Sequence, residues 1–115
     1  MIVVKINLKV FPEKQLECKQ TLLSMIESIR LEEGCLNFKV LNDIMDEYHF
    51  NLLEEWETRK DMNNHIQSNL FGVLLGSRIL LGQSIKIKIL TVSVKEGIEL
   101  VNFVKKTGHD IRTGN

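Results

Sequence analysis

The sequence predicts an α+β domain of the ferredoxin-like type, with strands and helices in the order β-α-β-β-α-β. Two observations lead to this prediction. Four segments alternate apolar and polar residues with the period of a strand, and two segments between them carry apolar residues at helical spacing. The expected sheet is antiparallel and four-stranded, with the helices on one face. Because the other face still carries apolar residues, it is expected to bind a partner.

The first strand is expected over residues 2–10, where apolar residues occupy every second position. Pro12 cannot extend a sheet ladder and suits the start of a helix from about residue 13 to residue 31. The apolar stripe expected for this helix consists of Leu16, Leu22, Leu23, Met25, Ile26 and Ile29. Gly34 then suits a left-handed cap that ends the helix.

Two strands are expected next, from residue 35 to about residue 45 and from there to residue 57. The polar pair Asp46–Glu47 interrupts these two apolar segments, which predicts a hairpin between them.

A second helical region is expected from about residue 60 to Gly82, with a break near residues 67–69. Ser68 or Asn69 would cap the part after the break. The last strand of the sheet is expected over residues 84–94, where apolar and polar residues again alternate.

The domain is expected to cover residues 1–94, followed by an extension over residues 95–115. Apolar residues at helical spacing predict one short helix there, and Gly108 suits its end, followed by a tail. The extension could reinforce a dimer or cover the mouth of a pocket.

The composition limits the classes of function. A chain of 115 residues is the size of one domain. Lys plus Arg and Asp plus Glu number 15 each, and this balance argues against a general nucleic-acid or anionic-membrane binder. No apolar run approaches the ~20 residues of a membrane span, and the first residues lack the pattern of a signal peptide, so a cytoplasmic protein is expected. Cys18 and Cys35 are expected to be buried free thiols.

The most informative segment runs from residue 50 to residue 71. Glu54 and Trp56 share one face of the third strand, because they are two residues apart. Thr58 and Asp61, three residues apart, resemble a capping box that begins a helix. That helix carries His65 on its apolar face, so it can return an imidazole toward the carboxylate and the indole.

These residues also carry a resemblance to a known family. The pattern E-x-W at Glu54–Trp56, followed by His65, Ser68 and Phe71, resembles the antibiotic biosynthesis monooxygenase family of small dimeric α/β-barrel proteins. The segment E-E-G-C-L-N-F at residues 32–38 is similar to the family's entry into its second strand. The resemblance covers roughly residues 2–93 and implies a homodimer in which two sheets pack into a barrel.

Three residues are the candidate catalytic groups. His65 has the pKa range of a general base, although it could equally be a core histidine satisfied by Glu54 or a carbonyl. Trp56 offers a flat wall for an aromatic substrate, or plain core packing. In the haem-degrading branch of the family an Asn at the strand position of Asn7 is a pocket residue, but strict alternation places Asn7 on the face of Val3 and Lys5, toward solvent or a partner.

Six further residues are candidates for substrate contact. Glu54 could orient His65 or the Trp56 indole, or form a salt bridge at the dimer interface. Arg78 could bind an anionic oxygen or lie exposed in solvent. The expected wall or core residues are Phe38, Phe50, Phe71 and Leu75.

The sequence gives no support for a cofactor or a metal. It contains no G-x-G-x-x-G, P-loop, H-E-x-x-H or C-x-x-C motif, and its three histidines lack metal-ligand spacing. The haem-degrading branch ligates iron with a histidine ten residues after the position of His65. Leu75 stands there in this chain and cannot ligate iron, so that activity is not expected.

Three functions follow from the sequence. The resemblance implies first a cofactor-independent monooxygenase, in which a small aromatic or quinol-type substrate forms an anion and donates an electron to O₂. The second is an isomerase or degradative enzyme for a small oxygenated metabolite, as in the branch that processes autoinducer-2. The third is a dimeric module that binds a ligand without turnover.

Overall fold

The structure is a computed structural model that describes the backbone of residues 1–114 and the side chains of residues 1–74, 76 and 84–107. Its elements, in chain order, are β1 (Ile2–Val10), η1 (Pro12–Lys14), α1 (Gln15–Arg30), β2 (Cys35–Asp43), β3 (Asp46–Trp56), α2 (Arg59–Ile66), α3 (Asn69–Leu81), β4 (Gly82–Thr91) and α4 (Ile98–Gly114).

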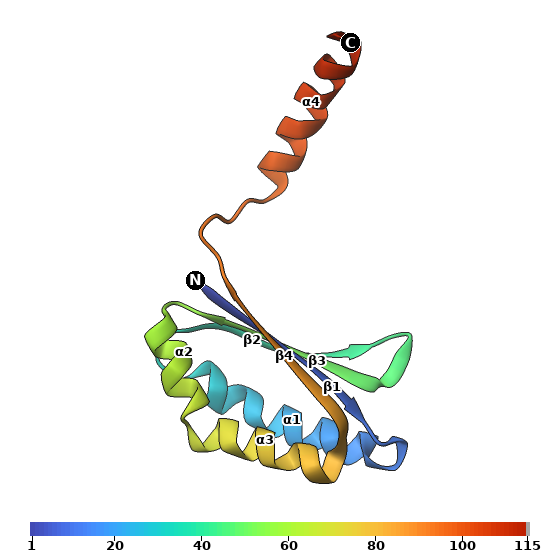
Figure 1. Cartoon of the computed structure of the whole chain (residues 1–115), viewed down its shortest axis with the longest axis vertical. Coiled ribbons are helices and arrows are strands. Elements are labelled where there is room, and N and C mark those ends of the chain that lie inside the picture. The colour runs from blue at the N-terminus through green and yellow to red at the C-terminus, as the bar shows by residue number, and fades with distance from the viewer. Residues whose placement is uncertain (115) are drawn as a thin grey trace.

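The four strands form one antiparallel sheet in the order β2-β3-β1-β4. Helices α1, α2 and α3 lie together on one face of this sheet, whereas α4 stands apart from the body (Figure 1). The arrangement confirms the predicted ferredoxin-like β-α-β-β-α-β fold. Within the described residues, no helix has both the length and the apolar composition needed to cross a lipid bilayer.

Helix α1 covers the sheet with one narrow row of side chains. Its buried residues are Cys18, Leu22, Met25 and Ile29, which are three or four positions apart. Leu16 and Leu23, predicted to belong to this stripe, are instead 62% and 52% exposed. At 100° per residue they lie roughly 150° around the helix from the buried row, so they face solvent.

The hairpin between β2 and β3 turns earlier than the sequence suggests. Its turn is at Ile44–Met45, and Asp46 already begins β3. The carboxylate of Asp43 accepts a hydrogen bond from the Met45 backbone N–H at 2.8 Å. A short aspartate that binds the backbone two residues ahead is a turn signal, and it outweighs the apolar character of the two tip residues.

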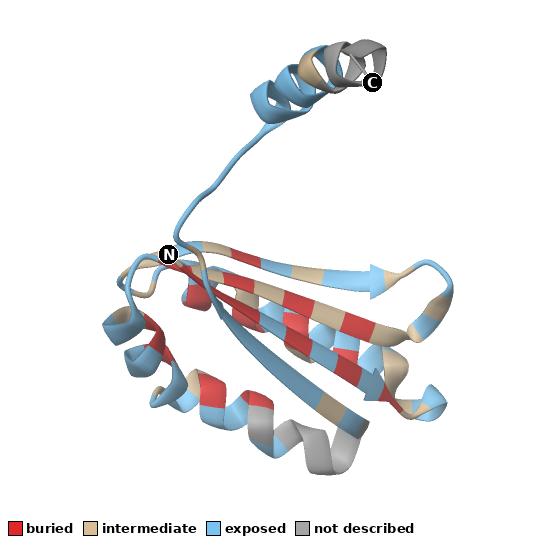
Figure 2. Ribbon diagram, turned by 45° about the horizontal axis from the view of Figure 1, so that its top comes forward, coloured by how far each residue is buried: buried red, intermediate tan, exposed pale blue. Residues whose placement is uncertain are grey.

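Burial alternates along the central strands, as Figure 2 shows. Every second residue of β1, from Ile2 to Val10, is buried toward the helices. The edge strand β4 is different, because Ile87 and Ile89 lie opposite buried residues of β1 yet remain 45% and 41% exposed. The helix layer therefore leaves the inner face of β4 partly open.

The face of the sheet without helices is called the open face here. It carries the apolar residues Val3, Leu41, Leu53 and Leu90, as the register shows. The same face also carries five exposed lysines, Lys5, Lys9, Lys39, Lys86 and Lys88. The expectation of an apolar open face is therefore met only in part, because the polar positions of the alternation are mostly lysine.

Helix α4 is longer than predicted. It continues past Gly108, the residue expected to end it, as far as Gly114. A glycine inside a helix costs only about 1 kcal/mol, so it need not end one. The apolar side chains of α4, from Ile98 to Val104, are between 42% and 65% exposed.

The turn between α1 and β2 depends on Gly34. Its φ of 77° is the left-handed conformation that favours glycine, as the sequence predicts. A Cβ at this position would meet the side chain of Asp61 in α2, and the Gly34 carbonyl accepts a hydrogen bond from the Glu57 N–H at 2.8 Å. The turn is thus packed against the start of α2.

We expect Gly34→Ala to lower the free energy of unfolding by about 1–3 kcal/mol, because of the positive φ and the contact with Asp61. Gly76→Ala in the middle of α3 is the matched control. A Cβ there meets nothing within 4 Å, so this variant should gain about 0.5–1 kcal/mol. Urea denaturation measures both. A Gly34→Ala variant as stable as the wild type would contradict this account of the turn.

Candidate functional site

A buried cluster forms where β3 meets α2. Glu54 and Trp56 point to the helix side of the sheet, and the Trp56 indole N–H donates to Glu54 Oε1 at 3.0 Å. Thr58 then caps α2 by accepting a hydrogen bond from the Asp61 N–H at 3.1 Å. The helix returns His65 to Glu54, with 3.3 Å between His65 Nε2 and Glu54 Oε2.

A second carboxylate binds the other nitrogen of His65. His65 Nδ1 lies 3.0 Å and 2.9 Å from the two carboxylate oxygens of Glu32, which is in the turn between α1 and β2. The imidazole is therefore held between two carboxylates that come from different parts of the chain.

Aromatic rings enclose the imidazole on two sides. The Trp56 ring stacks on His65 with centroids 4.5 Å apart and planes at 28°. The Phe71 ring from α3 meets it edge-on at 5.3 Å and 73°. The contacts hold the imidazole in one orientation between apolar walls.

The cluster is deeply buried. Glu54 and His65, at 0% and 1% exposure, are the buried polar or charged residues among the described side chains. Burial lowers the pKa of His65, but the hydrogen bonds and negative charges of Glu54 and Glu32 outweigh it, and the net result is a raised pKa. The favoured form is an imidazolium that donates an N–H to each carboxylate.

The sequence missed Glu32 as a site residue. It appears in the E-E-G-C-L-N-F segment, where it reads as part of a helix end. Gly34 could have indicated the position of Glu32, because the left-handed turn that follows Glu32 reverses the chain toward β3. Only the packing of this turn against α2 places Glu32 beside His65.

Asn7 does not join this cluster. The register pairs Asn7 with Asn51 of β3 and Lys86 of β4, all on the open face. Asn7 thus lies on the face that strict alternation along β1 gives it, and the structure does not bring it together with Trp56 and His65.

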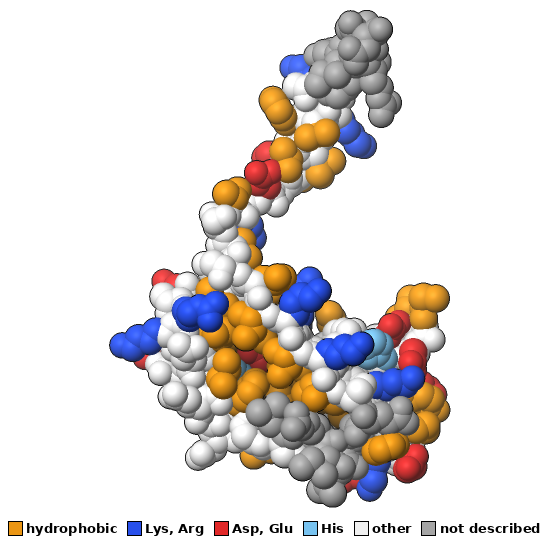
Figure 3. Space-filling view, in the orientation of Figure 1, with side chains coloured by type: hydrophobic (Ala, Val, Ile, Leu, Met, Phe, Trp, Pro, Cys, Tyr) orange, Lys and Arg blue, Asp and Glu red, His pale blue; other side chains and the backbone are white. Residues whose placement is uncertain are grey.

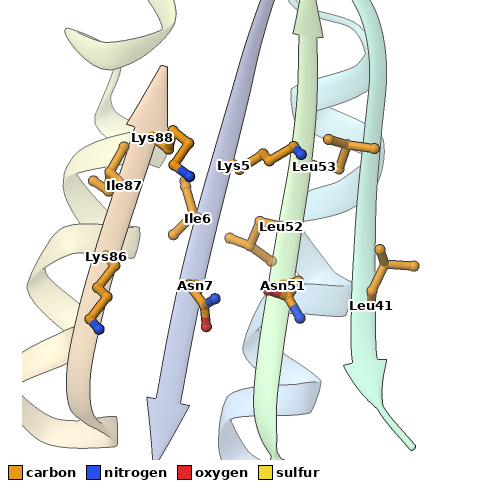
Figure 4. A pocket seen from close by; sticks show the side chains of 10 residues that line it. All are labelled: Lys5, Ile6, Asn7, Leu41, Asn51, Leu52, Leu53, Lys86, Ile87 and Lys88. Atoms are coloured by element: carbon orange, nitrogen blue, oxygen red, sulfur yellow. The ribbon is translucent and has the colours of Figure 1, made fainter. Parts of the chain in front are cut away.

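Asn7 instead borders a hollow on the open face, shown in Figure 4. Its volume is about 490 Å³. The residues that line it are Lys5, Ile6, Asn7, Leu41, Asn51, Leu52, Leu53, Lys86, Ile87 and Lys88. Three of them are lysines, so this hollow is positively charged, in contrast to the acidic cluster on the other side of the sheet.

The other candidate residues divide into three groups. Phe38 and Phe50 are core residues, each 1% exposed, and Phe38 lies directly across from Glu54 on β2. Phe71 contacts His65 as described. The side chains of Leu75 and Arg78 lie outside the described residues.

One row of side chains connects the cluster with the edge of the sheet. From the middle of the sheet outward, Glu54 lies opposite Val4 of β1, and Val4 lies opposite Ile89 of β4. With strands about 4.8 Å apart, Glu54 is roughly 10 Å from the half-exposed Ile89. Hydrophobic side chains gather on the surface between β4 and the helices in Figure 3.

The described residues include no group of three or more His, Cys, Asp or Glu side chains arranged to hold a metal ion. Cys18 is buried and Cys35 is half-buried, both as free thiols, and burial raises the pKa of Cys18 to about 11. Cys18 was correctly predicted to be a buried thiol, whereas Cys35 is only partly covered.

The fold and the cluster together define a small ferredoxin-like α+β protein with a buried carboxylate–imidazole–indole centre under its helices. The chain belongs to the antibiotic biosynthesis monooxygenase family, whose model matches residues 1–74.

Known relatives agree with this assignment. An uncharacterised Synechocystis protein is 31% identical over 93 residues, which are 80% of this chain and only 63% of that protein. The Bacillus subtilis protein named "Putative monooxygenase YcnE" is 31% identical over 71 residues, covering 62% of this chain and 75% of that protein. A Deinococcus radiodurans crystal structure, named as a putative antibiotic biosynthesis monooxygenase, has a TM-score of 0.80 at 21% identity. The match covers 84% of this chain and 97% of that one.

The raised pKa of His65 predicts a pH dependence of stability. Because the folded pKa lies above the usual 6.5, the stabilisation is fully present below pH 6.5 and is lost as pH rises through the folded pKa. We expect the free energy of unfolding in urea to fall as the pH rises above about 6.5, and to fall less in His65→Gln. Equal slopes for both proteins would contradict the shift.

Proposed function

We propose that this chain is a cofactor-independent monooxygenase that oxidises a small phenol or quinol with O₂. The observation that carries the proposal is the buried pair of Glu54 and His65 set against the Trp56 indole. Membership of the antibiotic biosynthesis monooxygenase family supports the reaction class. In this proposal the substrate supplies the electrons, and the protein supplies a proton acceptor and an apolar surface.

The reaction begins with the substrate hydroxyl. Because a phenolate gives up an electron more readily than a phenol, a base is needed, and the Glu54 carboxylate accepts the proton. The phenolate donates one electron to O₂, and the resulting substrate radical and superoxide combine to form a C–O bond. The proton that Glu54 accepted then returns to the peroxide anion and gives a hydroperoxide on a ring carbon that still bears a hydrogen atom. Loss of water leaves a carbonyl, so one substrate and one O₂ give one quinone and one H₂O.

Glu54 suits the role of base better than His65. The imidazole is held as an imidazolium by its two carboxylates, so its nitrogens already carry protons. Glu54 is buried and accepts two hydrogen bonds from the side chains that the structure describes, so its carboxylate retains lone pairs for a substrate proton. The sequence-based role of His65 as the base is accordingly replaced by a role in charge balance and proton transfer.

The partly open inner face of β4 supports a route for the substrate. A flat aromatic molecule that enters over Ile89 would meet Val4 as its floor and reach Glu54 from the side. Ile87 and Ile89 are apolar and exposed, which suits an aromatic ring. His65 and Glu54 themselves are closed to water, so side chains of the helix layer must move for a substrate to bind.

Oxygen uptake tests the proposal. With 1-naphthol, naphthalenediols and anthrone as a panel, we expect uptake above autoxidation by the metal-free protein. Glu54→Gln should lower kcat by about 10²-fold or more, because the general base is removed. Glu17→Gln on α1 is the matched control, since its carboxylate is exposed and pairs with Lys14.

Two results would contradict the proposal: product formation that persists without O₂, or a Glu54→Gln variant with the turnover of the wild type. The first would favour an isomerase, and the second would move the base elsewhere.

We also propose that a second copy of the chain covers the open face. The family resemblance supports this arrangement, and the apolar residues Leu41, Leu53 and Leu90 need a cover. Sedimentation equilibrium should give twice the 13.3 kDa of one chain. Leu53→Asp should shift the mass toward one chain, whereas Leu23→Asp on the solvent side of α1 should not. A monomeric wild type would exclude the dimer.

A further inference from the structure

We infer that Glu32 is the solvent-side end of a proton path that runs from Glu54 through the imidazole of His65. The inference rests on the proposed function, because the path carries the proton that the substrate releases. Glu32 contacts His65 and does not contact the reacting atoms, so it is a positioning residue and a proton carrier.

The hydrogen bonds of the path are continuous. Glu54 Oε2 lies 3.3 Å from His65 Nε2, and His65 Nδ1 lies within 3.0 Å of both oxygens of Glu32. The imidazolium of His65 can release its Nδ1 proton to Glu32 when Glu54 takes up a proton from the substrate, and it can take that proton back when Glu54 loses its own. Three groups in line therefore suffice to move a proton without rotation of any side chain.

Exposure rises in one direction along the path. The side chains of Glu54 and His65 are each 1% exposed, whereas the side chain of Glu32 is 22% exposed. Glu32 is thus the group of the three that can exchange a proton with bulk water. The other end, Glu54, lies beside Val4 in the row that leads to β4.

The turn that follows α1 positions Glu32. The Glu32 N–H donates to the Ile29 carbonyl at 3.1 Å, and the Glu32 carbonyl accepts from the Cys35 N–H at 3.1 Å. Its backbone groups are satisfied by the turn itself, so the side chain is not required as a cap. Both carboxylate oxygens are instead directed at His65.

Other titratable groups face the path from the neighbouring elements. The Cys35 thiol of β2 lies near both carboxylates, and burial together with the charges of Glu54 and Glu32 raises its pKa. Arg30, at the end of α1, donates from Nε to the Phe38 carbonyl at 3.1 Å and so is held by the backbone of β2. The thiol therefore stays neutral, and the path consists of the two carboxylates and the imidazole.

The path serves both proton steps of the proposed reaction. The substrate hydroxyl proton passes to Glu54, His65 passes a proton on to Glu32, and Glu32 releases it to water. After the C–O bond has formed, one proton returns along the same groups and completes the hydroperoxide, and it leaves in the product water when the O–O bond breaks. No proton is gained or lost overall, and O₂ is the sole oxidant.

The test compares Glu32→Gln and Glu32→Ala with the wild type in oxygen uptake. We expect kcat to fall at least about tenfold, with KM nearly unchanged. General acid–base catalysis contributes ~10²–10⁴-fold to a rate, and loss of the path removes part of this contribution. Added formate or acetate should restore turnover of Glu32→Ala in a concentration-dependent way, because the vacated position is partly open to solvent. Glu33→Gln, at the exposed neighbouring residue, is the matched control.

A second readout does not depend on turnover. NMR measures the exchange of the His65 ring N–H protons with water, which we expect to be slower in Glu32→Gln than in the wild type. If the wild type consumes no oxygen with any substrate of the panel, the proposed function fails. The exchange rate of the His65 ring N–H protons then tests the path by itself. The path is overturned if Glu32→Gln and Glu32→Ala keep the wild-type kcat and Glu32→Gln exchanges at the wild-type rate, even where both variants are less stable. Glu32 would then be a structural ion-pair partner only.

Discussion

The position of helix α2 depends on one buried interaction, the bonding of His65 to Glu54 and Glu32. It connects α2 and the end of β3, which follow each other in sequence, with the turn after α1, where Glu32 lies 33 residues before His65. A charged group in the interior must be paired, and loss of one partner of a buried pair costs about 3–5 kcal/mol. Apolar packing alone would allow α2 to slide along the sheet, whereas these hydrogen bonds can form in only one position of the helix. The stacked indole of Trp56 adds a second restraint on the same ring.

Local patterns predicted most of the fold and every residue of the cluster except Glu32. Period-two alternation located the strands, and Glu54, Trp56 and His65 were found because a strand, a cap and a helix follow directly in sequence. Glu32 was missed, because its contact with His65 joins residues 33 positions apart and arises from the packing of a turn. Alternation along β1 placed Asn7 on the open face, where the structure has it, whereas the resemblance alone gives no information on which face of the strand the side chain occupies.

The sheet separates two chemically different surfaces. Under the helices, apolar walls surround an acidic cluster that excludes water. On the open face, lysines surround a shallow hollow lined by leucine and asparagine. Because strand residues alternate between the two sides, a shift of one position in β1 would exchange Asn7 with Ile6 and place lysines in the core. The register of β1 therefore keeps the acidic and the basic chemistry apart.

The contact between Gly34 and Asp61 also bears on how the chain tolerates changes in length. The connection from α1 to β2 and the connection from β3 to α2 lie against each other, and the Gly34 carbonyl is bonded to Glu57. An insertion in either connection would displace the other, so related chains should conserve the lengths of both together. The hairpin tip at Ile44–Met45, whose side chains are 101% and 91% exposed, has no such restraint. Added segments, such as a peptide tag or a small inserted domain, are best accommodated there.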